Sequence, residues 1–398
     1  MITVRFSKGA AGLAAATPAP QLLWHDRDYE VELFEQLGPE RARCEGKLLA
    51  AGLSLPVQHR TEWALAHHTR TQWFVAVKAA SAGYQAGFAV EVRRSRAIPG
   101  HLLLSVEKFG AALSEGARAA GLRALAYLGR SRPRVLRVYV NVYAQEAGVR
   151  QRIGRLLREL GFRDAAQPRV YRDTVLVDLA PDEAAILASF HSSTRRNIRK
   201  IAAQPFEVRT LAESHLIDRL KALLEESVTR TGGSPPHEDW EAVIALSDRY
   251  PELSHLVGLF RTDITGPEAL VAFAWGLNHG NYVDNPVTGM TRLPGSRTPF
   301  TYPLIWDLIR WGKRVGARYF DFGGVTSGHL SEGDPLGGIS DFKRRFSDTI
   351  VSVGEEWTLE PNPLRGQLAA ALSSASSWVS RRLRTVAPTS PSRNISPM

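Results

Sequence analysis

The stretch from residue 317 to residue 343 (ARYFDFGGVTSGHLSEGDPLGGISDFK) combines residue types that could do chemistry where a strand ends. Asp321 alternates with two phenylalanines, so its carboxylate is expected on the opposite face of the strand from their rings. Gly323 and Gly324 follow at once, and glycines at the end of a strand let a ligand approach the backbone. The acid can orient a reacting amine, or it can hold the loop through hydrogen bonds. The residues themselves leave both roles open.

A second stretch, residues 190–201 (FHSSTRRNIRKI), concentrates positive charge. Two serines and a threonine are good N-cap residues for a helix that starts near Arg195. Arg195 and Arg199, like Arg196 and Lys200, are four residues apart, and like charges at that spacing repel each other on an isolated helix. The interpretation is either a solvated basic face or an anion site, because free amides at a helix N-terminus suit a phosphate.

Other chemistries find little support in the sequence. Cys44 is the only cysteine, which excludes an intramolecular disulfide and a cysteine-based zinc site. No pair of histidines has the HxH or HxxxH spacing of metal ligands, and no Walker or Rossmann phosphate loop is present. We therefore expect neither a metal nor a resident cofactor.

The composition indicates a globular protein with more than one domain. The chain has 398 residues, a hydrophobic fraction of 44% and a charged fraction of 23%, and no apolar run is long enough to span a membrane. Its net charge of +10 is uneven: residues 191–200 carry four cations and residues 361–398 carry five, and neither segment has an acid. Such clusters favour a polyanionic partner, such as phosphate, nucleic acid or an anionic membrane surface.

Hydrophobic periodicity places elements in both halves of the chain. In the first half, the expected strands are 73–79, 84–92, 101–106, 134–143 and 170–179, and the expected helices are 114–129 and 149–160. In the second half, the expected helices are 181–203 with a break near Phe190, 213–230, 237–249, 302–315 and 339–346, and the expected strands are 254–261, 268–277, 281–287, 317–322 and 349–359.

The two halves repeat one order of elements. In each half several antiparallel strands precede one helix and one further strand, as in 114–143 and again in 302–322. This repeat predicts an α+β fold of two tandem domains with mostly antiparallel sheets. The expected division is a poorly ordered arm at 1–20, a first domain at 21–178, a second at 179–360 that holds the catalytic cleft, and a basic tail at 361–398.

The order of motifs resembles the Fem family of peptidoglycan-bridge aminoacyltransferases. The resemblance rests on RRNIRK in the basic helix, then YFDFGG at the end of a strand, then GISDFKRRF before the last strand, over about residues 60–360. It implies two tandem domains of the GNAT acyltransferase fold. It also implies transfer of an aminoacyl group from aminoacyl-tRNA to an amine of a peptidoglycan precursor.

The resemblance also implies site residues. Phe342 and Lys343 match the Phe-Lys pair of the family, whose lysine is implicated in contacting the acyl donor or the oxyanion of the tetrahedral intermediate. Asp321 matches the strand acid of the family pattern, without a firm catalytic role. The residues of the basic helix, where phosphates of the precursor or of tRNA are the expected ligands, are Arg195, Arg196, Asn197 and Lys200, and the glycine pair Gly323 and Gly324 completes the expected site.

Two departures bear on the acyl donor. Residues 204–260 leave no room for the long helical hairpin that many Fem enzymes insert, which weakens the assignment of tRNA. GNAT enzymes that use acyl-CoA usually carry Q/R-x-x-G-x-G/A, and the nearest match, residues 292–297, has Arg297 where a small residue belongs. A bulky side chain there would crowd the backbone approach, so a CoA donor is not favoured. An acyl-CoA-dependent N-acyltransferase acting on a surface polysaccharide or metabolite is the alternative enzyme. A nonenzymatic protein that binds nucleic acid or membranes is the second alternative.

The basic tail suggests a further contact. Leu364, Leu368 and Leu372 fall on one helical stripe, and arginines follow, as in helices that lie on an anionic bilayer. The segment 364–384 can equally dock on the protein's own surface. The expected location is the cytoplasm, with a peripheral contact at the inner membrane surface through this segment.

Overall fold

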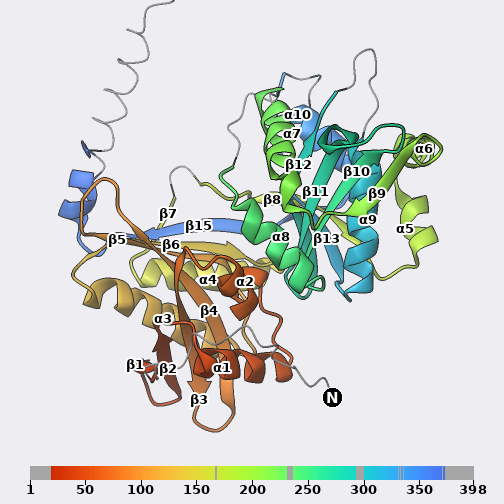
Figure 1. The fold of residues 1–398 in the computed structure, drawn as a ribbon. Coiled ribbons are helices and arrows are strands. Elements are labelled where there is room, and N and C mark those ends of the chain that lie inside the picture. Colours follow the sequence, from red (N-terminus) through yellow and green to blue (C-terminus); the bar gives the residue numbers. More distant parts are fainter. Residues whose placement is uncertain are drawn as a thin grey trace, which may run out of the picture.

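The computed structural model describes residues 19–165, 168–230, 236–292, 300–329, 331, 333–334, 336–369 and 371–372. Within this part of the chain, fifteen strands form two sheets that are mostly antiparallel, and α-helices pack around them (Figure 1). The α+β class expected from the sequence is therefore confirmed. The expected arm at 1–20 lies almost wholly outside the described residues.

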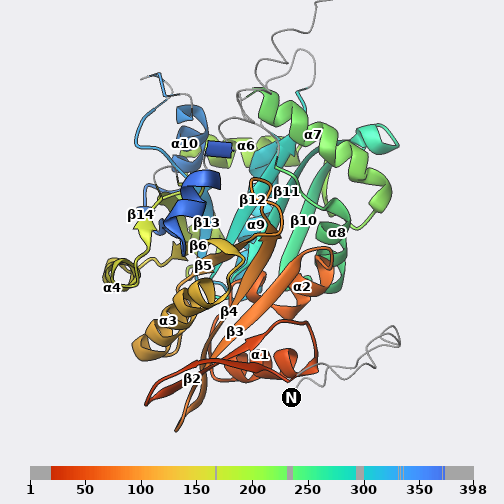
Figure 2. The same cartoon turned by 90° about the vertical axis from the view of Figure 1, so that its left-hand side faces the viewer.

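The first sheet has eight strands among the described residues. In spatial order they are β1 (Gln21–His25), β2 (Tyr29–Phe34), β3 (Thr71–Ala79), β4 (Gly83–Arg94), β5 (Leu102–Phe109), β6 (Val135–Tyr143), β15 (Gly354–Leu359) and β7 (Arg163–Asp164). The helices of this half are α1 (Pro39–Ala50), α2 (Thr61–Ala66), α3 (Glu115–Ser131) and α4 (Ala147–Glu159). Figure 2 shows α3 and α4 on one side of the sheet and α1 and α2 on the other.

The second sheet has seven strands among the described residues. In spatial order they are β14 (Ile350–Ser352), β8 (Asp173–Asp178), β13 (Tyr319–Gly324), β12 (Tyr282–Met290), β11 (Leu270–Asn278), β10 (Ser254–Arg261) and β9 (Phe206–Thr210). The helices of this half are α5 (Glu183–Ser189), α6 (Ser192–Ala202), α7 (Ile217–Arg230), α8 (Trp240–Arg249), α9 (Thr301–Arg314) and α10 (Gly337–Arg344).

Each sheet contains one pair of parallel strands joined by a helix. In the first sheet α3 connects β5 to β6, and in the second α9 connects β12 to β13. Parallel neighbours need such a crossover, and the crossover helix buries an apolar face on the sheet. Leu122, Leu125 and Leu128 of α3 are fully buried in one core, and Leu304 and Leu308 of α9 in another. The repeat that the sequence predicted is this unit of a strand, a crossover helix and a parallel strand, which occurs once in each sheet.

The two sheets exchange strands across the expected division at residue 178. β8 ends at that residue yet pairs with β13 and β14 of the second sheet, whereas β15 returns to the first sheet and pairs with β6 (Figure 1). The single strand expected at 349–359 is therefore wrong, because β14 and β15 belong to different sheets. The chain crosses at Gly354, where a Cβ atom would lie 1.9 Å from the carbonyl oxygen of Tyr171, so only glycine fits.

The break expected near Phe190 is confirmed. Phe190 is buried against Trp306 and Phe346, and it separates α5 from α6. The serine or threonine cap expected for a helix that starts near Arg195 is wrong, because α6 already starts at Ser192 and the ring of His191 accepts the hydrogen bond from the Ser193 N–H.

Candidate active site

A cavity opens where the parallel strands of the second sheet part. The pairing of β12 with β13 stops at Asp284 and Asp321, and beyond this point a cavity of about 390 Å³ lies between them. The second half contributes Asn285, Pro286, Gly323, Gly324 and Lys343 to its wall, and the first half contributes Gln58, Glu107, Lys108, Asn141 and Tyr143. Clefts of this kind, with a few convergent polar groups, are the usual place for a ligand.

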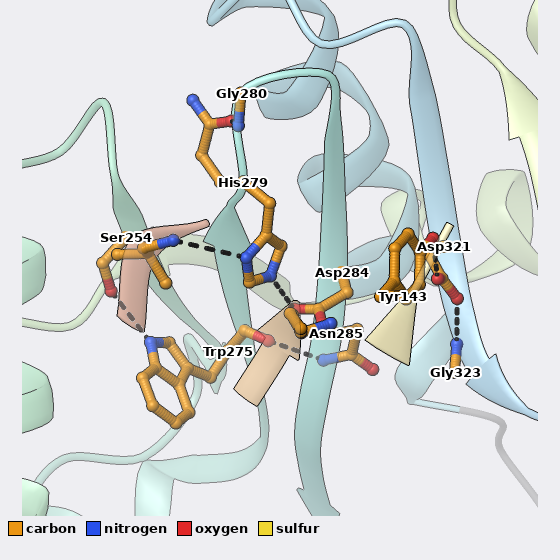
Figure 3. Close-up of polar contacts among 12 residues, drawn as sticks. Tyr143, Ser254, Trp275, His279, Gly280, Asp284, Asn285, Asp321 and Gly323 are labelled. Atoms are coloured by element: carbon orange, nitrogen blue, oxygen red, sulfur yellow. Dashed lines mark hydrogen bonds and ion pairs between the residues drawn. The ribbon is translucent and has the colours of Figure 1, made fainter. Parts of the chain in front are cut away.

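Asp321 is fully buried beside this cavity and accepts hydrogen bonds on both carboxylate oxygens. Oδ2 accepts from the hydroxyls of Tyr143 (2.6 Å) and Tyr171 (3.2 Å). Oδ1 accepts from Thr174 Oγ1. It also accepts from the Gly323 N–H at 2.7 Å (Figure 3). Four donors saturate the carboxylate, which favours the loop-holding role among the two that the sequence left open.

The tyrosines around Asp321 stay protonated. Burial, and next the negative charge of Asp321, raise the pKa of Tyr143 and of Tyr171 well above the ordinary range. Both rings line the cavity. Each hydroxyl therefore acts as a hydrogen-bond donor to Asp321 rather than as a proton acceptor.

The glycine pair shapes the cavity wall in two ways. Gly323 has φ +70°, a backbone conformation that costs other residues energy. A Cβ atom on Gly324 would lie 2.6 Å from the Cβ of Tyr171, so a side chain there would displace the tyrosine that contacts Asp321. The two glycines thus bring bare backbone to the cavity, as the sequence suggested.

Lys343 lies in the cavity wall near the end of α10. Its Nζ donates to the carbonyl oxygen of Gly324 at 2.6 Å, which is the only hydrogen bond of this ammonium to the described residues. Burial lowers the pKa of Lys343 to about 8, although the charge of Asp321 acts in the opposite direction. The ammonium therefore keeps donor capacity for a ligand and titrates close to neutral pH.

Phe342 does not line this cavity. Its ring packs edge-on against Tyr302 and Phe346, 5.0 and 5.3 Å away between centroids. These contacts anchor α10 on the core of the second half. Phe342 and Lys343 therefore have different roles. The Phe342 ring fixes α10, and the Lys343 side chain points into the cavity.

Sequence reasoning missed Lys108, which the first half contributes. Its ammonium forms an ion pair with Asp284 at 2.7 Å and lies 4.9 Å from the ring centre of Tyr143 and 5.1 Å from that of Tyr282. Lys108 is the only non-glycine among the described residues with positive φ (48°), and such strained backbone concentrates at functional sites. No signal in the chain could have joined Lys108 to Asp284, because they are 176 residues apart.

Asp284 connects the ion pair to a buried histidine (Figure 3). Nδ1 of His279 accepts the backbone N–H of Val57, so its proton lies on Nε2, which faces Asp284 Oδ1 at 3.1 Å. Burial by itself would raise the pKa of Asp284, but the ammonium of Lys108 and the neighbouring imidazole of His279 outweigh it and hold that pKa well below the usual range. Burial likewise lowers the pKa of His279.

The basic helix lies outside the wall of this cavity. Arg196 and Lys200 on α6 are exposed and Asn197 is half-buried, whereas the guanidinium of Arg195 donates to the backbone carbonyls of Ala188 and Phe190. The helix start nevertheless packs on the residue after α10: the carbonyl of Arg345 accepts from His191 N–H (2.9 Å) and Thr194 Oγ1 (3.2 Å). α6 is therefore connected to the short helix that carries Lys343.

Some expectations fall on residues that are not described. The loop 292–297, considered as a CoA motif, is described only at Arg292, and the tail segment 364–384 only to residue 372, without residue 370. Leu364, Leu368 and Leu372 are exposed, and Arg365 donates to the carbonyl of Pro133. The membrane contact stays a prediction.

None of the helices within the described residues is long and apolar enough to cross a membrane. The same part of the chain holds no group of three or more His, Cys, Asp or Glu side chains placed to bind a metal ion.

Solved structures share this fold. A crystal structure of FemX superposes with a TM-score of 0.62 over 79% of this chain and 94% of that chain, at 12% identity. The fold resembles that of FemX. The structure of L-PGS from Bacillus licheniformis gives a TM-score of 0.50 over 87% of this chain and 98% of that chain, at 10% identity. The tandem GNAT-like fold expected from the resemblance is thereby confirmed.

Sequence comparison adds nothing to this likeness. No protein-family model matches the chain, and no curated protein sequence matches it.

Proposed function

We propose that this protein is an acyltransferase that forms an amide between an activated acyl or aminoacyl group and an amine of a peptidoglycan or other cell-envelope precursor. The preferred donor is aminoacyl-tRNA. The observation that carries the proposal is Lys343, whose ammonium lies in a cavity between parting parallel strands and makes a single hydrogen bond to the described residues. The fold shared with FemX supports the same reaction class.

The proposed step needs no nucleophile from the protein. The neutral acceptor amine attacks the ester carbonyl carbon, a C–N bond forms, and the carbonyl electron pair moves onto oxygen. The Lys343 ammonium stabilises this oxyanion. When it collapses, the C–O bond to the donor breaks, and the proton lost by the amine ends on the leaving oxygen. A positioned cation or donor at an oxyanion typically contributes 10²–10³ in rate.

Other residues position this step in the proposal. Asp321 holds Tyr143, Tyr171 and the Gly323 backbone, and so fixes the cavity wall against which Lys343 lies. Phe342 fixes α10. We also propose that the exposed cations of α6 bind phosphates of the acceptor precursor, because α6 begins against Arg345, two residues after Lys343.

One reaction mixture tests the proposal. The protein is incubated with a pool of charged tRNA, acyl-CoAs and a lipid-linked or UDP-linked peptidoglycan precursor, and mass additions to the precursor are read. The expected result is one aminoacyl addition that depends on charged tRNA and disappears in Lys343→Ala, while that variant keeps its melting temperature.

Other results would contradict parts of the proposal. Full activity of folded Lys343→Ala would remove this site. Products formed only with acyl-CoA would select the alternative enzyme. RNA or vesicle binding without any mass addition would select the nonenzymatic alternative.

A further inference from the structure

A second concentration of arginines lies on the first sheet, away from the basic helix that the sequence emphasised. Two cavities of about 630 and 710 Å³ lie side by side on this sheet and share Arg137 and Tyr139 in their walls. We call them together the arginine groove. Its arginines are Arg93, Arg94, Arg96, Arg130, Arg137, Arg163 and Arg169. The acids in its walls are Asp164, Glu356 and Glu360. These lining residues have a net charge of +4.

The groove leads to the catalytic cavity along one strand. Alternate residues of β6 share a face of the sheet: Arg137 and Tyr139 line the groove, and Asn141 and Tyr143 line the catalytic cavity. At about 3.3 Å per residue, the path from residue 137 to residue 143 is about 20 Å long. Arg169 lines both the groove and the cavity. The two sites are therefore continuous.

Two acids of the groove are already neutralised by its own arginines. Glu360 pairs with Arg137, and the buried Glu356 accepts both Nε (2.8 Å) and Nη2 (2.5 Å) of Arg169. In contrast, the exposed guanidinium groups of Arg94 and Arg96 make no hydrogen bond or ion pair with any residue in the described part of the chain. The end of the groove far from the catalytic cavity thus carries positive charge that no acid of the described residues neutralises, so an anion can bind there.

An aromatic ring lies among these cations. The guanidinium of Arg169 is 4.2 Å from the ring centre of Tyr139, and that of Arg137 is 5.7 Å away. Cations interleaved with aromatic rings are typical of surfaces that bind single-stranded nucleic acid, where arginines contact phosphates and bases stack on rings. The basic run of α6 has no aromatic residue between its cations. The groove, not α6, therefore has the chemistry of a strand-binding surface.

We infer that the arginine groove binds the phosphodiester backbone of a single-stranded RNA end and directs its acylated terminus into the catalytic cavity. The inference rests on the proposed function, since it gives the path of the proposed donor. A single phosphate group would need only one of the two cavities, whereas a strand occupies a path of about 20 Å with spaced cations and a ring.

RNA binding by the full-length protein tests the inference. Binding of a short fluorescent single-stranded RNA is followed by anisotropy over a series of salt concentrations. The double variant Arg94→Gln with Arg96→Gln is expected to bind about tenfold more weakly, and its slope of log K against log salt should fall by about 1.4, the value for two lost phosphate contacts on a single strand.

The matched control removes the same charge elsewhere. Arg249 and Arg314 are exposed, lie at the ends of α8 and α9, and line neither the groove nor the catalytic cavity. Arg249→Gln with Arg314→Gln should bind the RNA like the wild type. Tyr139→Ala should weaken binding about tenfold and Tyr139→Phe should not, because stacking needs the ring and not the hydroxyl.

The outcomes separate this inference from the proposed function. Equal RNA binding by the wild type and the Arg94/Arg96 variant, together with tRNA-dependent transfer, would overturn the groove and leave the function standing. Equal losses of RNA affinity in the Arg94/Arg96 variant and in the Arg249/Arg314 control would also overturn the inference, because the net charge of the protein would then account for binding. Displacement of the RNA by equimolar inorganic pyrophosphate would assign the groove to a small phosphate ligand and overturn the RNA path.

Discussion

At the scale of single residues, the feature that matters most is a lysine whose charge is set by its surroundings. Burial lowers the pKa of Lys343 to about 8, so the ammonium is the main form at pH 7 but not at pH 9. An oxyanion is stabilised by the charged form alone. The acceptor amine has the opposite requirement, since only its neutral form attacks.

These two requirements predict a bell-shaped dependence of kcat/KM on pH. The rate should rise as the acceptor amine loses its proton, and fall above about pH 8 as Lys343 loses its own. In Lys343→Arg the falling limb should disappear from the accessible range, because a guanidinium stays charged. A pH–rate series on both proteins measures this. An unchanged falling limb in an active Lys343→Arg variant would show that another group titrates there.

At the scale of elements, the sequence was most informative where the signal is local. The Phe190 break, the glycine pair at the end of β13 and the helix that carries Lys343 each follow from neighbouring residues, and each was found. The neighbours of Asp321 were not, because Tyr143 and Tyr171 reach it from strands and loops that are 178 and 150 residues away. Pairing at such distances leaves no trace in periodicity.

The last strand illustrates the same limit. Residues 349–359 alternate as one strand would, and only the packing shows that β14 and β15 enter different sheets. Trp357 is buried in the core of the first half, next to β6, a strand that precedes it by more than 200 residues. The arginine groove was missed for a related reason: its arginines are spread over 77 positions of the chain, from residue 93 to residue 169, and only the sheet brings them together.

The basic helix gives a prediction at this scale. Arg196 and Lys200 are exposed on α6, whereas Arg195 holds the backbone between α5 and α6 and is left intact. Arg196→Gln with Lys200→Gln should raise KM for a phosphate-linked acceptor about tenfold at unchanged kcat, as expected when a contact is equal in the ground and transition states. An acceptor without phosphate provides the control, since its KM should not move. An unchanged KM for both acceptors would contradict phosphate binding by α6 and show that its cations form a solvated basic face.

At the scale of the whole molecule, the cavity that holds Lys343 lies where the two sheets are held together. Polar contacts among the described residues cross between them: Tyr143 of β6 donates to Asp321 of β13, and Lys108 of β5 pairs with Asp284 of β12. Both contacts lie at the cavity. The strand exchange through β8 and β15 ties the same two sheets covalently. Cavity shape and folding are thus coupled in this chain.

The ion pair makes this coupling measurable. Side-chain exposure is 16% for Lys108 and 9% for Asp284, so removal of either partner leaves the other as a buried charge without its opposite charge. Lys108→Met should lower the free energy of unfolding by about 3 kcal/mol, within the range for a broken buried pair. Asp284→Asn should be similarly costly. The double variant leaves no isolated charge, so it should lose clearly less than the sum of the two single losses.

Urea unfolding followed by tryptophan fluorescence measures these differences, with Lys78→Met as the matched control. Lys78 pairs with Glu30 at 3.8 Å on the surface of the same sheet, and exposed pairs contribute about 1 kcal/mol or less. Strictly additive losses at Lys108 and Asp284 would mean that this ion pair does not couple the two sheets. If the double variant loses more free energy of unfolding than the two single variants together, each side chain also makes separate contacts with the cavity wall.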